Sequence, residues 1–463
     1  MKINQENRMK KILVSVAAAT MALSTTASAL EDIKVSGQAK LFYETDNKVS
    51  VNGSDGVGNQ RKDNGLFDRR NSAGEVTFKL GMTGKQGDVG FGATVYHSNT
   101  MGLENNVVSV TRTKAVEEDV YFGELYFTAP VAPDTVLKFG KQELDTPLAF
   151  TERWNSLPNT FNAAVAINSS IDNVTLIGAY IGQGNGNATT ARVEDPADPS
   201  KPEKYVNGTW QASSDFESFY GGAYALAALY KQDTFAANFW AYYINNAIQA
   251  DLRPPATGIA ENVDAYAAWF DAGVKMGDAN VKGYLAYMDH TGSSELAKAI
   301  GKTGDGVNGD ATFAAALSAD MKISDITLFG AASYVSEGDL PVANTATGYK
   351  KTMLPTQGIY ADGLFVAQPG STAVKVSAAT KLGDTALSLN AVHNMNSGAE
   401  NERMGILGTR AQELEMTEVY ATVKQKLGAF DLMGIVMHHE YDDSKTDKTK
   451  GGQTVRIVAS VNF

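Results

Sequence analysis

The sequence contains no cysteine among its 463 residues, so disulfides, thiolate metal sites and cysteine nucleophiles are excluded. Beyond residue 29 it also lacks an apolar run of about 18 residues, which a membrane-spanning helix would need. Basic residues are in deficit as well, because 40 Lys and Arg stand against 52 Asp and Glu. Binding a phosphate backbone needs a basic surface. We therefore expect no nucleic-acid partner.

The first 29 residues have the three parts of a secretory signal peptide. A start rich in Lys and Arg is followed by an apolar run over residues 12–23 and by Ala27-Ser28-Ala29, a small-x-small pattern that precedes a cleavage site. The apolar run is shorter than the roughly 20 residues of a membrane anchor. We expect residues 1–29 to be cleaved after export and residues 30–463 to form a single domain.

Apolar and polar residues alternate strictly in several segments of the remaining chain. From Ile33 to Glu44 the odd positions are apolar or small and most even positions are polar. This stretch is longer than a typical soluble strand of about 5–6 residues and fits a membrane strand of about 9–11 residues. The same alternation recurs in residues 75–82, 89–96 and 121–128. Its length favours strands that cross a bilayer.

The connections between these segments alternate in length. Short turn signals rich in Gly, Asn and Asp lie at residues 83–88, 130–134, 169–173, 231–233, 277–280, 322–325, 382–384 and 427–429. Long polar stretches such as 45–72, 182–217 and 337–370 lie between them. Eight short turns, flanked by a first and a last strand, give about 18 strands, the pattern of bacterial outer-membrane barrels.

The predicted fold is therefore all-β, a closed transmembrane antiparallel β-barrel of about 18 strands. Its short turns would be periplasmic and its long loops extracellular. A barrel of this size leaves an aqueous lumen rather than a packed core. We expect the protein to reside in the outer membrane of a Gram-negative bacterium.

The last ten residues form one more alternating segment, with Val455, Ile457, Ala459, Val461 and Phe463 on one face. A chain that stops on an aromatic residue at an outward position resembles the C-terminal signature of outer-membrane proteins. The resemblance implies that the barrel-assembly machinery recognises Phe463. An ordinary terminal strand is the alternative.

Charged residues on the polar face of the clearer strands are candidates for the pore wall. They are Lys34, Lys40, Lys79, Glu124, Lys138, Glu418 and Arg456. Lumen residues face water, so charges there cost little and can bias which solutes pass. The alternative for each residue is a position on a generic solvated wall.

The connection over residues 143–162 is unusually apolar for an exposed loop. Its large apolar residues are Leu144, Leu148, Phe150, Trp154, Leu157 and Phe161. Such side chains need burial, and in a barrel the lumen offers it, so we predict that this loop folds inward and forms a constriction. Glu143, Asp145, Glu152 and Arg153 are its candidate rim charges. Packing of the loop on a neighbouring protomer is the alternative.

This region carries a resemblance to a known family. Gly140-Lys141-Gln142 before the loop, Pro147 within it, and Leu157-Pro158 followed by Thr160-Phe161 at its end resemble the OprD-type porins. The resemblance implies an 18-stranded channel with a basic ladder on one wall and an acidic side at the constriction. It also implies uptake of small carboxylate-bearing or cationic solutes. The family's basic residue just before Leu-Pro is missing here, and Arg153 is the candidate replacement.

Together these features predict a porin whose water-filled channel lets small polar or charged solutes and ions diffuse passively. No bond is made or broken, so no catalytic residue, cofactor or metal is expected. His438 and His439 are neighbours in a strand and point to opposite faces, so they do not form a ligand pair. A surface adhesin or structural protein is the first alternative. A barrel hydrolase is the second, although no nucleophile–base set supports it.

The expected partners follow from this location. They are outer-membrane lipid and lipopolysaccharide, the barrel-assembly machinery and the permeating solutes. The sequence leaves monomer and homotrimer open, because alanine-rich outward faces such as residues 223–228 suit either a second barrel or lipid.

Overall fold

The computed structural model describes residues 30–47, 65–68, 72–99, 120–186, 190–193, 204–207, 216–248, 263–291, 311–347, 351–363, 365–396, 414–443 and 448–463. The expected signal peptide, residues 1–29, lies outside the described residues. Among the residues that are described, no helix is long and apolar enough to cross a membrane.

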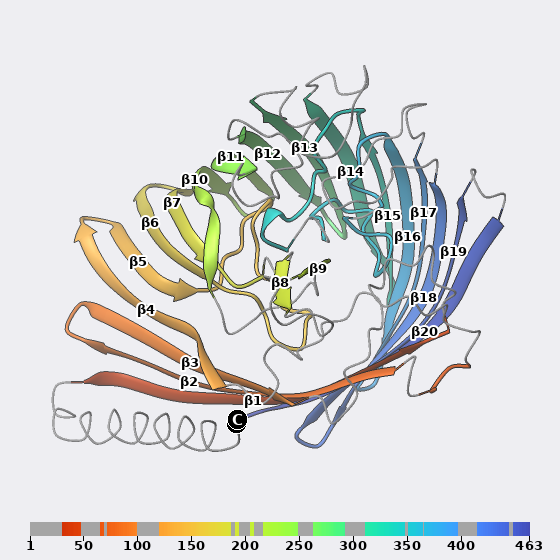
Figure 1. Ribbon diagram of the computed structural model, residues 1–463, viewed down its shortest axis with the longest axis horizontal. Coiled ribbons are helices and arrows are strands. Elements are labelled where there is room, and N and C mark those ends of the chain that lie inside the picture. The colour runs from red at the N-terminus through yellow and green to blue at the C-terminus, as the bar shows by residue number, and fades with distance from the viewer. Residues whose placement is uncertain are drawn as a thin grey trace.

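Strands of the described chain form one closed, antiparallel, 18-stranded sheet (Figure 1). They are β1 (Glu31–Asp46), β2 (Ser72–Gln86), β3 (Val89–Asn99), β4 (Val120–Ala132), β5 (Thr135–Gln142), β6 (Phe161–Ile171), β7 (Val174–Gly184), β10 (Glu217–Lys231), β11 (Phe235–Ile248), β12 (Val263–Met276), β13 (Ala279–His290), β14 (Thr312–Ile323), β15 (Ile326–Val335), β16 (Ser371–Leu382), β17 (Thr385–Asn396), β18 (Leu414–Leu427), β19 (Phe430–Asp443) and β20 (Lys448–Asn462). Each pairs with the next, and β20 pairs back with β1 from Gln38↔Asn462 to Asp46↔Thr454. The predicted fold class is confirmed.

Two short strands are not part of this 18-stranded sheet. β8 (Thr190–Val193) and β9 (Lys204–Asn207) pair with each other in the connection between β7 and β10. The chain also has a three-residue 3-10 helix, η4 (Thr345–Thr347).

Tight turns join the strands at the eight positions that the sequence predicts. Several hold a residue in the left-handed region, for example Asn173 at φ 63° and Gly277 at φ 63°. Glycine and asparagine adopt this conformation at low steric cost, which explains their abundance there. Because successive strands alternate in direction, the tight turns share one end of the barrel and the longer connections share the other.

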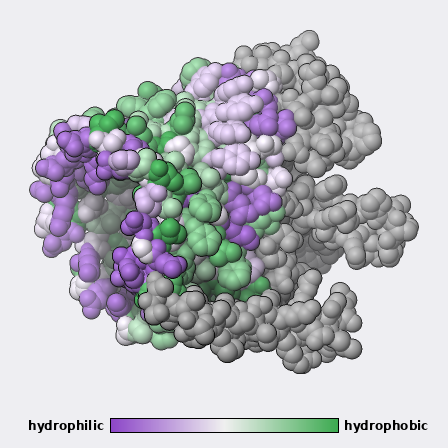
Figure 2. Space-filling view, turned by 90° about the vertical axis from the view of Figure 1, so that its left-hand side faces the viewer, coloured by the Kyte–Doolittle hydropathy of each residue, from purple (hydrophilic) through white to green (hydrophobic). Residues whose placement is uncertain are grey.

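The outer face of the barrel is apolar. Val35 and Leu41 on β1 and Val76 and Leu80 on β2 are exposed, Val35 to 66% of its surface, while their polar neighbours point inward. Figure 2 shows hydrophobic side chains across the middle of one outer face and hydrophilic ones gathered at its left-hand edge. Apolar surface on this scale needs an apolar medium around it.

Aromatic rings form a row on the outside of β7 to β12. Neighbouring ring centroids are 5.1 Å apart for Tyr180 and Tyr224, 6.2 Å for Tyr224 and Tyr243, and 5.3 Å for Tyr243 and Tyr266. Rows of aromatic residues mark the levels at which outer-membrane barrels meet the membrane–water interface. This row lies toward the end of the barrel that carries the long connections.

β4 departs from the strict alternation expected for residues 121–128. The register with β3 shifts between Thr94↔Glu124 and Val95↔Phe122, which leaves Gly123 as an extra residue in β4. Such a bulge reverses the face on which the following side chains point. Tyr121 consequently faces inward and is buried, whereas Phe122 faces outward and is exposed.

Two connections fold into the ring of strands (Figure 1). The first is loop 143–160 between β5 and β6, and the second is loop 336–370 between β15 and β16. Phe150 and Leu157 of the first, and Val342 and Ala343 of the second, are almost completely buried. The sequence predicts the first of these inward folds, but it suggests only an ordinary polar loop for the second. That expectation is corrected here.

Candidate functional site

Loop 143–160 crosses the interior of the barrel from one wall to the other. On one side Leu144, Leu148 and Ala149 share an apolar cluster with Trp240 and Tyr242 of β11. The far end of the loop is anchored on three other strands. Lys40 Nζ of β1 donates to the carbonyl of Asn155 at 3.0 Å, Thr77 Oγ1 of β2 donates to that of Ser156 at 3.2 Å, and Thr160 Oγ1 donates to the carbonyl of Gly123 in β4 at 2.7 Å.

The two inner loops are joined by a set of buried hydrogen bonds. The amide of Asn344 accepts from the backbone N–H of Phe150 and donates to its carbonyl, both at 3.0 Å. Thr345 N–H donates to the carbonyl of Leu148 at 2.8 Å. Because both partners are excluded from water, loss of either would leave a buried polar group unsatisfied. The pairing therefore fixes the position of loop 143–160.

Glu152 belongs to this junction and not to the rim of the constriction, where the sequence places it. Its side chain is fully buried, and its carboxylate accepts hydrogen bonds from Asn155 Nδ2 at 3.2 Å, from Asn344 Nδ2 at 3.3 Å and from Thr347 Oγ1. A buried carboxylate is tolerated when several donors satisfy it. Glu152 therefore connects the two loops instead of facing the lumen.

The other three loop charges lie together and reach solvent. Arg153 Nε donates to Glu143 Oε2 at 2.6 Å, and its Nη1 donates to Asp145 Oδ1 at 3.0 Å. The side chains of Arg153 and Asp145 are 50% and 69% exposed. Partial burial opposes the charged form, but the hydrogen bonds to the two carboxylates raise the pKa of the Arg153 guanidinium. The group is therefore a permanent cation on an otherwise acidic loop tip.

Three of the predicted wall lysines and one glutamate line the inner face beside this loop tip. Lys40 on β1 and Lys79 on β2 both interact electrostatically with Glu143, and Lys79 and Lys138 on β5 interact with Glu124 on β4. Glu124 also accepts a hydrogen bond from Thr94 Oγ1 at 2.9 Å. The structure thus brings cations from three strands and carboxylates from β4 and the loop to one side of the interior.

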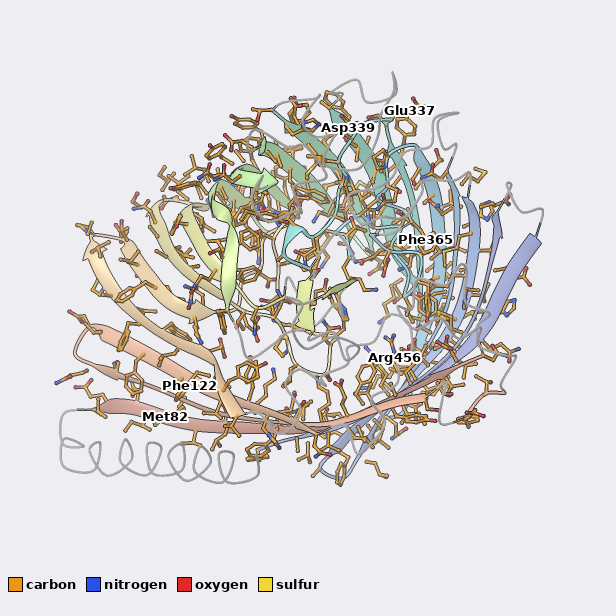
Figure 3. All side chains as sticks on the ribbon, viewed as in Figure 1. Met82, Phe122, Glu337, Asp339, Phe365 and Arg456 are labelled. Atoms are coloured by element: carbon orange, nitrogen blue, oxygen red, sulfur yellow. The ribbon has the colours of Figure 1, made fainter. Side chains whose placement is uncertain are left out.

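The two remaining basic candidates lie away from this group. Lys34 follows the inward phase of β1 near the tight-turn end, opposite Thr83. Arg456 on β20 (Figure 3) is only 9% exposed. Its Nε donates to Oε2 of Glu44 on β1 at 2.6 Å, and its guanidinium lies 5.4 Å from the centroid of the Phe42 ring. Arg456 thus connects the first and last strands and is not an open wall charge.

Glu418 points inward as the sequence predicts, but loop 336–370 covers it. Its buried carboxylate accepts the backbone N–H groups of Ile359 at 2.7 Å, Tyr360 at 2.6 Å and Ala361 at 2.8 Å. The expectation that it is a solvated wall charge is corrected, because all three donors belong to the covering loop. The inward fold of this loop is not predicted from the sequence, although the loop has the apolar content that marks loop 143–160. Its large apolar residues include Leu340, Leu354, Ile359, Tyr360, Phe365 and Val366.

We expect Glu418→Ala to loosen loop 336–370 without unfolding the barrel. The change leaves three backbone N–H groups without their acceptor, and each buried unsatisfied donor costs about 1–3 kcal/mol. Limited proteolysis should cut the variant in this loop faster than the wild type. Glu415→Ala is the matched control, because Glu415 lies three residues away on the outer face of β18. Equal cleavage of loop 336–370 in both variants would show that Glu418 does not hold it.

No metal site emerges from the described part of the chain, in which no three His, Asp or Glu side chains converge. The adjacent histidines of β19 point to opposite faces. His438 is exposed and lies 3.1 Å from Glu440, whereas His439 is buried and stacks on Tyr360 at 4.7 Å.

Comparison with known proteins finds matches among solved structures. No protein-family model and no curated protein matches the sequence. OpdO of Pseudomonas aeruginosa superposes with a TM-score of 0.61 at 13% identity, covering 94% of this chain and 99% of OpdO. OpdK of that organism, solved with vanillate, gives 0.62 at 11% identity over 93% and 98% of the two chains. OccK2 (OpdF), solved with glucuronate, gives 0.59 at 13% identity over 94% and 98%.

These matches span nearly the whole length of both chains. Because the sequence identity is low, they show similarity of the fold alone. The residues around loop 143–160 resemble the OprD-type porins, and that resemblance implies an 18-stranded barrel. The ring of 18 strands agrees with it. The chain therefore has the 18-stranded barrel fold of the OprD/Occ porins.

Proposed function

We propose that the protein is an outer-membrane porin through which small polar or charged solutes and ions diffuse passively. The exposed charged tip of loop 143–160 carries this proposal. The apolar side of the loop is buried and locked, while Asp145 and Arg153 remain open to solvent inside the ring. A solvated narrowing lined by fixed charges sets solute size and charge preference in channels of this kind.

The charges near the constriction favour small carboxylates among these solutes. Lys40, Lys79, Lys138 and Arg153 supply positive groups on one side of the interior, and Glu124, Glu143 and Asp145 lie among them. An anion could pass from one cation to the next without binding tightly to any of them. The OpdK and OccK2 structures, which hold vanillate and glucuronate, are consistent with this solute class.

The orientation that we propose places the long connections outside the cell and the tight turns in the periplasm. The apolar outer face and its row of tyrosines support a membrane location, with lipid and lipopolysaccharide as neighbours. Export through residues 1–29 belongs to the same proposal.

The exposure of Phe463 supports its recognition by an assembly factor. Its ring is exposed on the outer face, 6.1 Å from the ring of Phe78. It lies over Gly37, where a Cβ atom would come within 2.2 Å of it, and the two residues exchange backbone hydrogen bonds of 2.6 and 3.0 Å. We propose that the barrel-assembly machinery recognises this terminal aromatic residue.

Planar-bilayer recordings test the proposed function. The wild type should give stable open steps, whereas an adhesin or an enzyme would give none. Arg153→Ala should shift the reversal potential toward cation preference, because it leaves Glu143 and Asp145 unneutralised. Asp145→Ala should shift it the opposite way and less, since one of the two carboxylates remains.

Glu415→Gln on the outer face is the control for these recordings and should leave the reversal potential unchanged. If neither Arg153→Ala nor Asp145→Ala differs from this control, the two residues are not part of the constriction.

A further inference from the structure

The inner face of β3 carries glycine where the neighbouring strand carries an aromatic residue. Gly92 pairs directly with Tyr126 of β4. A Cβ atom built on Gly92 would lie 2.4 Å from Cζ, 2.6 Å from the hydroxyl oxygen and 2.7 Å from Cε1 of the Tyr126 ring. The ring therefore occupies the space that a side chain at position 92 would need. It lies against the wall instead of projecting into the interior.

The same ring carries a lysine from the next strand. Lys138 Nζ of β5 lies 3.9 Å from the centroid of the Tyr126 ring. A cation over an aromatic face is attracted by the negative face of the ring. Gly92, Tyr126 and Lys138 thus form a stack across three adjacent strands, which we call the Gly92–Tyr126–Lys138 stack.

A similar set of glycine, tyrosine and lysine lies next to this stack and packs against loop 143–160. Tyr96 lies over Gly123, with Cε2 at 2.3 Å from a built Cβ, and Lys79 Nζ is 5.1 Å from its ring. Tyr96 is fully buried and clusters with Tyr121 and with Leu157 of loop 143–160. Tyr126 is only half-buried, and Lys138 lies three residues from the tight turn that begins β5. The Gly92–Tyr126–Lys138 stack therefore lies between the constriction and the tight-turn end.

We propose that Tyr126, seated on Gly92, is a positioning residue that holds the Lys138 ammonium against the wall. The stack thereby sets the width and the anion preference of the tight-turn half of the pore. A lysine on a flexible four-carbon stem otherwise samples many positions, and a tyrosine without a glycine beneath it would point into the passage. This inference rests on the proposed channel function and adds Gly92 and Tyr126 to the residues that shape the pore.

Four variants in planar bilayers test the width. Gly92→Ala should lower conductance, because the added Cβ forces the ring off the wall. Tyr126→Phe should match the wild type, since the ring face is kept. Tyr126→Leu should lose part of the anion preference without losing conductance. In the Gly92→Ala/Tyr126→Leu double variant, conductance should return to that of Tyr126→Leu, because no ring remains to be displaced.

A chemical measurement tests the placement of Lys138 without requiring conduction. The rate of acylation of Lys138 in the folded, detergent-solubilised protein is followed by mass spectrometry, with Lys34 as the internal reference. Tyr126→Leu should raise the relative rate about two- to five-fold, the factor expected from losing an exposed cation–π contact. Tyr126→Phe should leave it unchanged.

The proposal is overturned if Gly92→Ala conducts like the wild type, or if the double variant conducts less than Tyr126→Leu. It is also overturned if Tyr126→Leu leaves Lys138 acylation unchanged. A wild-type protein that gives no conductance would contradict the channel function itself, and the acylation rates would still decide whether the stack positions Lys138.

Discussion

Replacing Glu152 by leucine is expected to release loop 143–160 from loop 336–370 and to give larger, noisier single-channel steps. The substitution removes the acceptor shared by Asn155, Asn344 and Thr347. Each buried donor left without a partner costs about 1–3 kcal/mol, so the loop junction loses several kcal/mol in total. Since this junction sets how far the loop reaches across the interior, the pore should widen and fluctuate.

Glu415→Gln is the control for the Glu152 variant, because it changes an exposed acidic residue on the outer face of β18, away from both inner loops. Planar-bilayer recordings and limited proteolysis of both loops provide the measurements. Glu152→Leu channels with wild-type step size and wild-type resistance to protease would show that Glu152 does not join the loops.

The second large effect concerns the contact between the first and last strands. Arg456→Met removes the partner of Glu44 and leaves a fully buried carboxylate without its cation. Breaking a buried ion pair from one side costs about 3–5 kcal/mol. In detergent electrophoresis a folded barrel migrates faster than the unfolded chain. The temperature at which heating converts the folded band to the unfolded band should therefore be clearly lower for Arg456→Met.

Two further variants separate this cause from a general loss of packing. Glu44→Met/Arg456→Met should recover most of the loss, because a buried pair replaced by apolar residues is often neutral or stabilising. Lys85→Met removes an exposed ion pair of Lys85 with Asp32 and should leave the transition unchanged. A double variant as unstable as Arg456→Met alone would contradict the role assigned to the pair.

The barrel could be predicted because its signal is local. Period-two alternation fixes which face of β1 or β2 is apolar, and the turns are marked by residues that accept left-handed backbone. The reversal at Gly123 could not be predicted in this way. The bulge there depends on how β4 pairs with β3, and on Tyr96, whose ring needs the space above this glycine.

The candidate site was harder to predict, because alternation identifies the inner face but not what covers it. Glu418 points inward as expected, yet three N–H groups of a loop nearly sixty residues earlier occupy its carboxylate. Glu152 and Arg153 are adjacent in the sequence, and each carries a single charge. Only the packing against Asn344 decides that the first is buried and the second reaches the lumen.

The apolar content of loop 143–160 did predict its inward fold, because large apolar side chains need burial. The same reasoning applies to loop 336–370, where Thr, Asn, Gly and Pro residues between the apolar ones hide the signal. Composition over the whole connection is therefore a better guide than its polarity residue by residue.

The central claim is that the ring encloses a passage open to small solutes, and liposome swelling tests it most directly. Liposomes that contain the purified, heat-modifiable protein should swell in isotonic solutions of small solutes, at rates that fall as solute size increases. Liposomes with the folded protein that swell no faster than protein-free ones, even with the smallest solute, would contradict the claim.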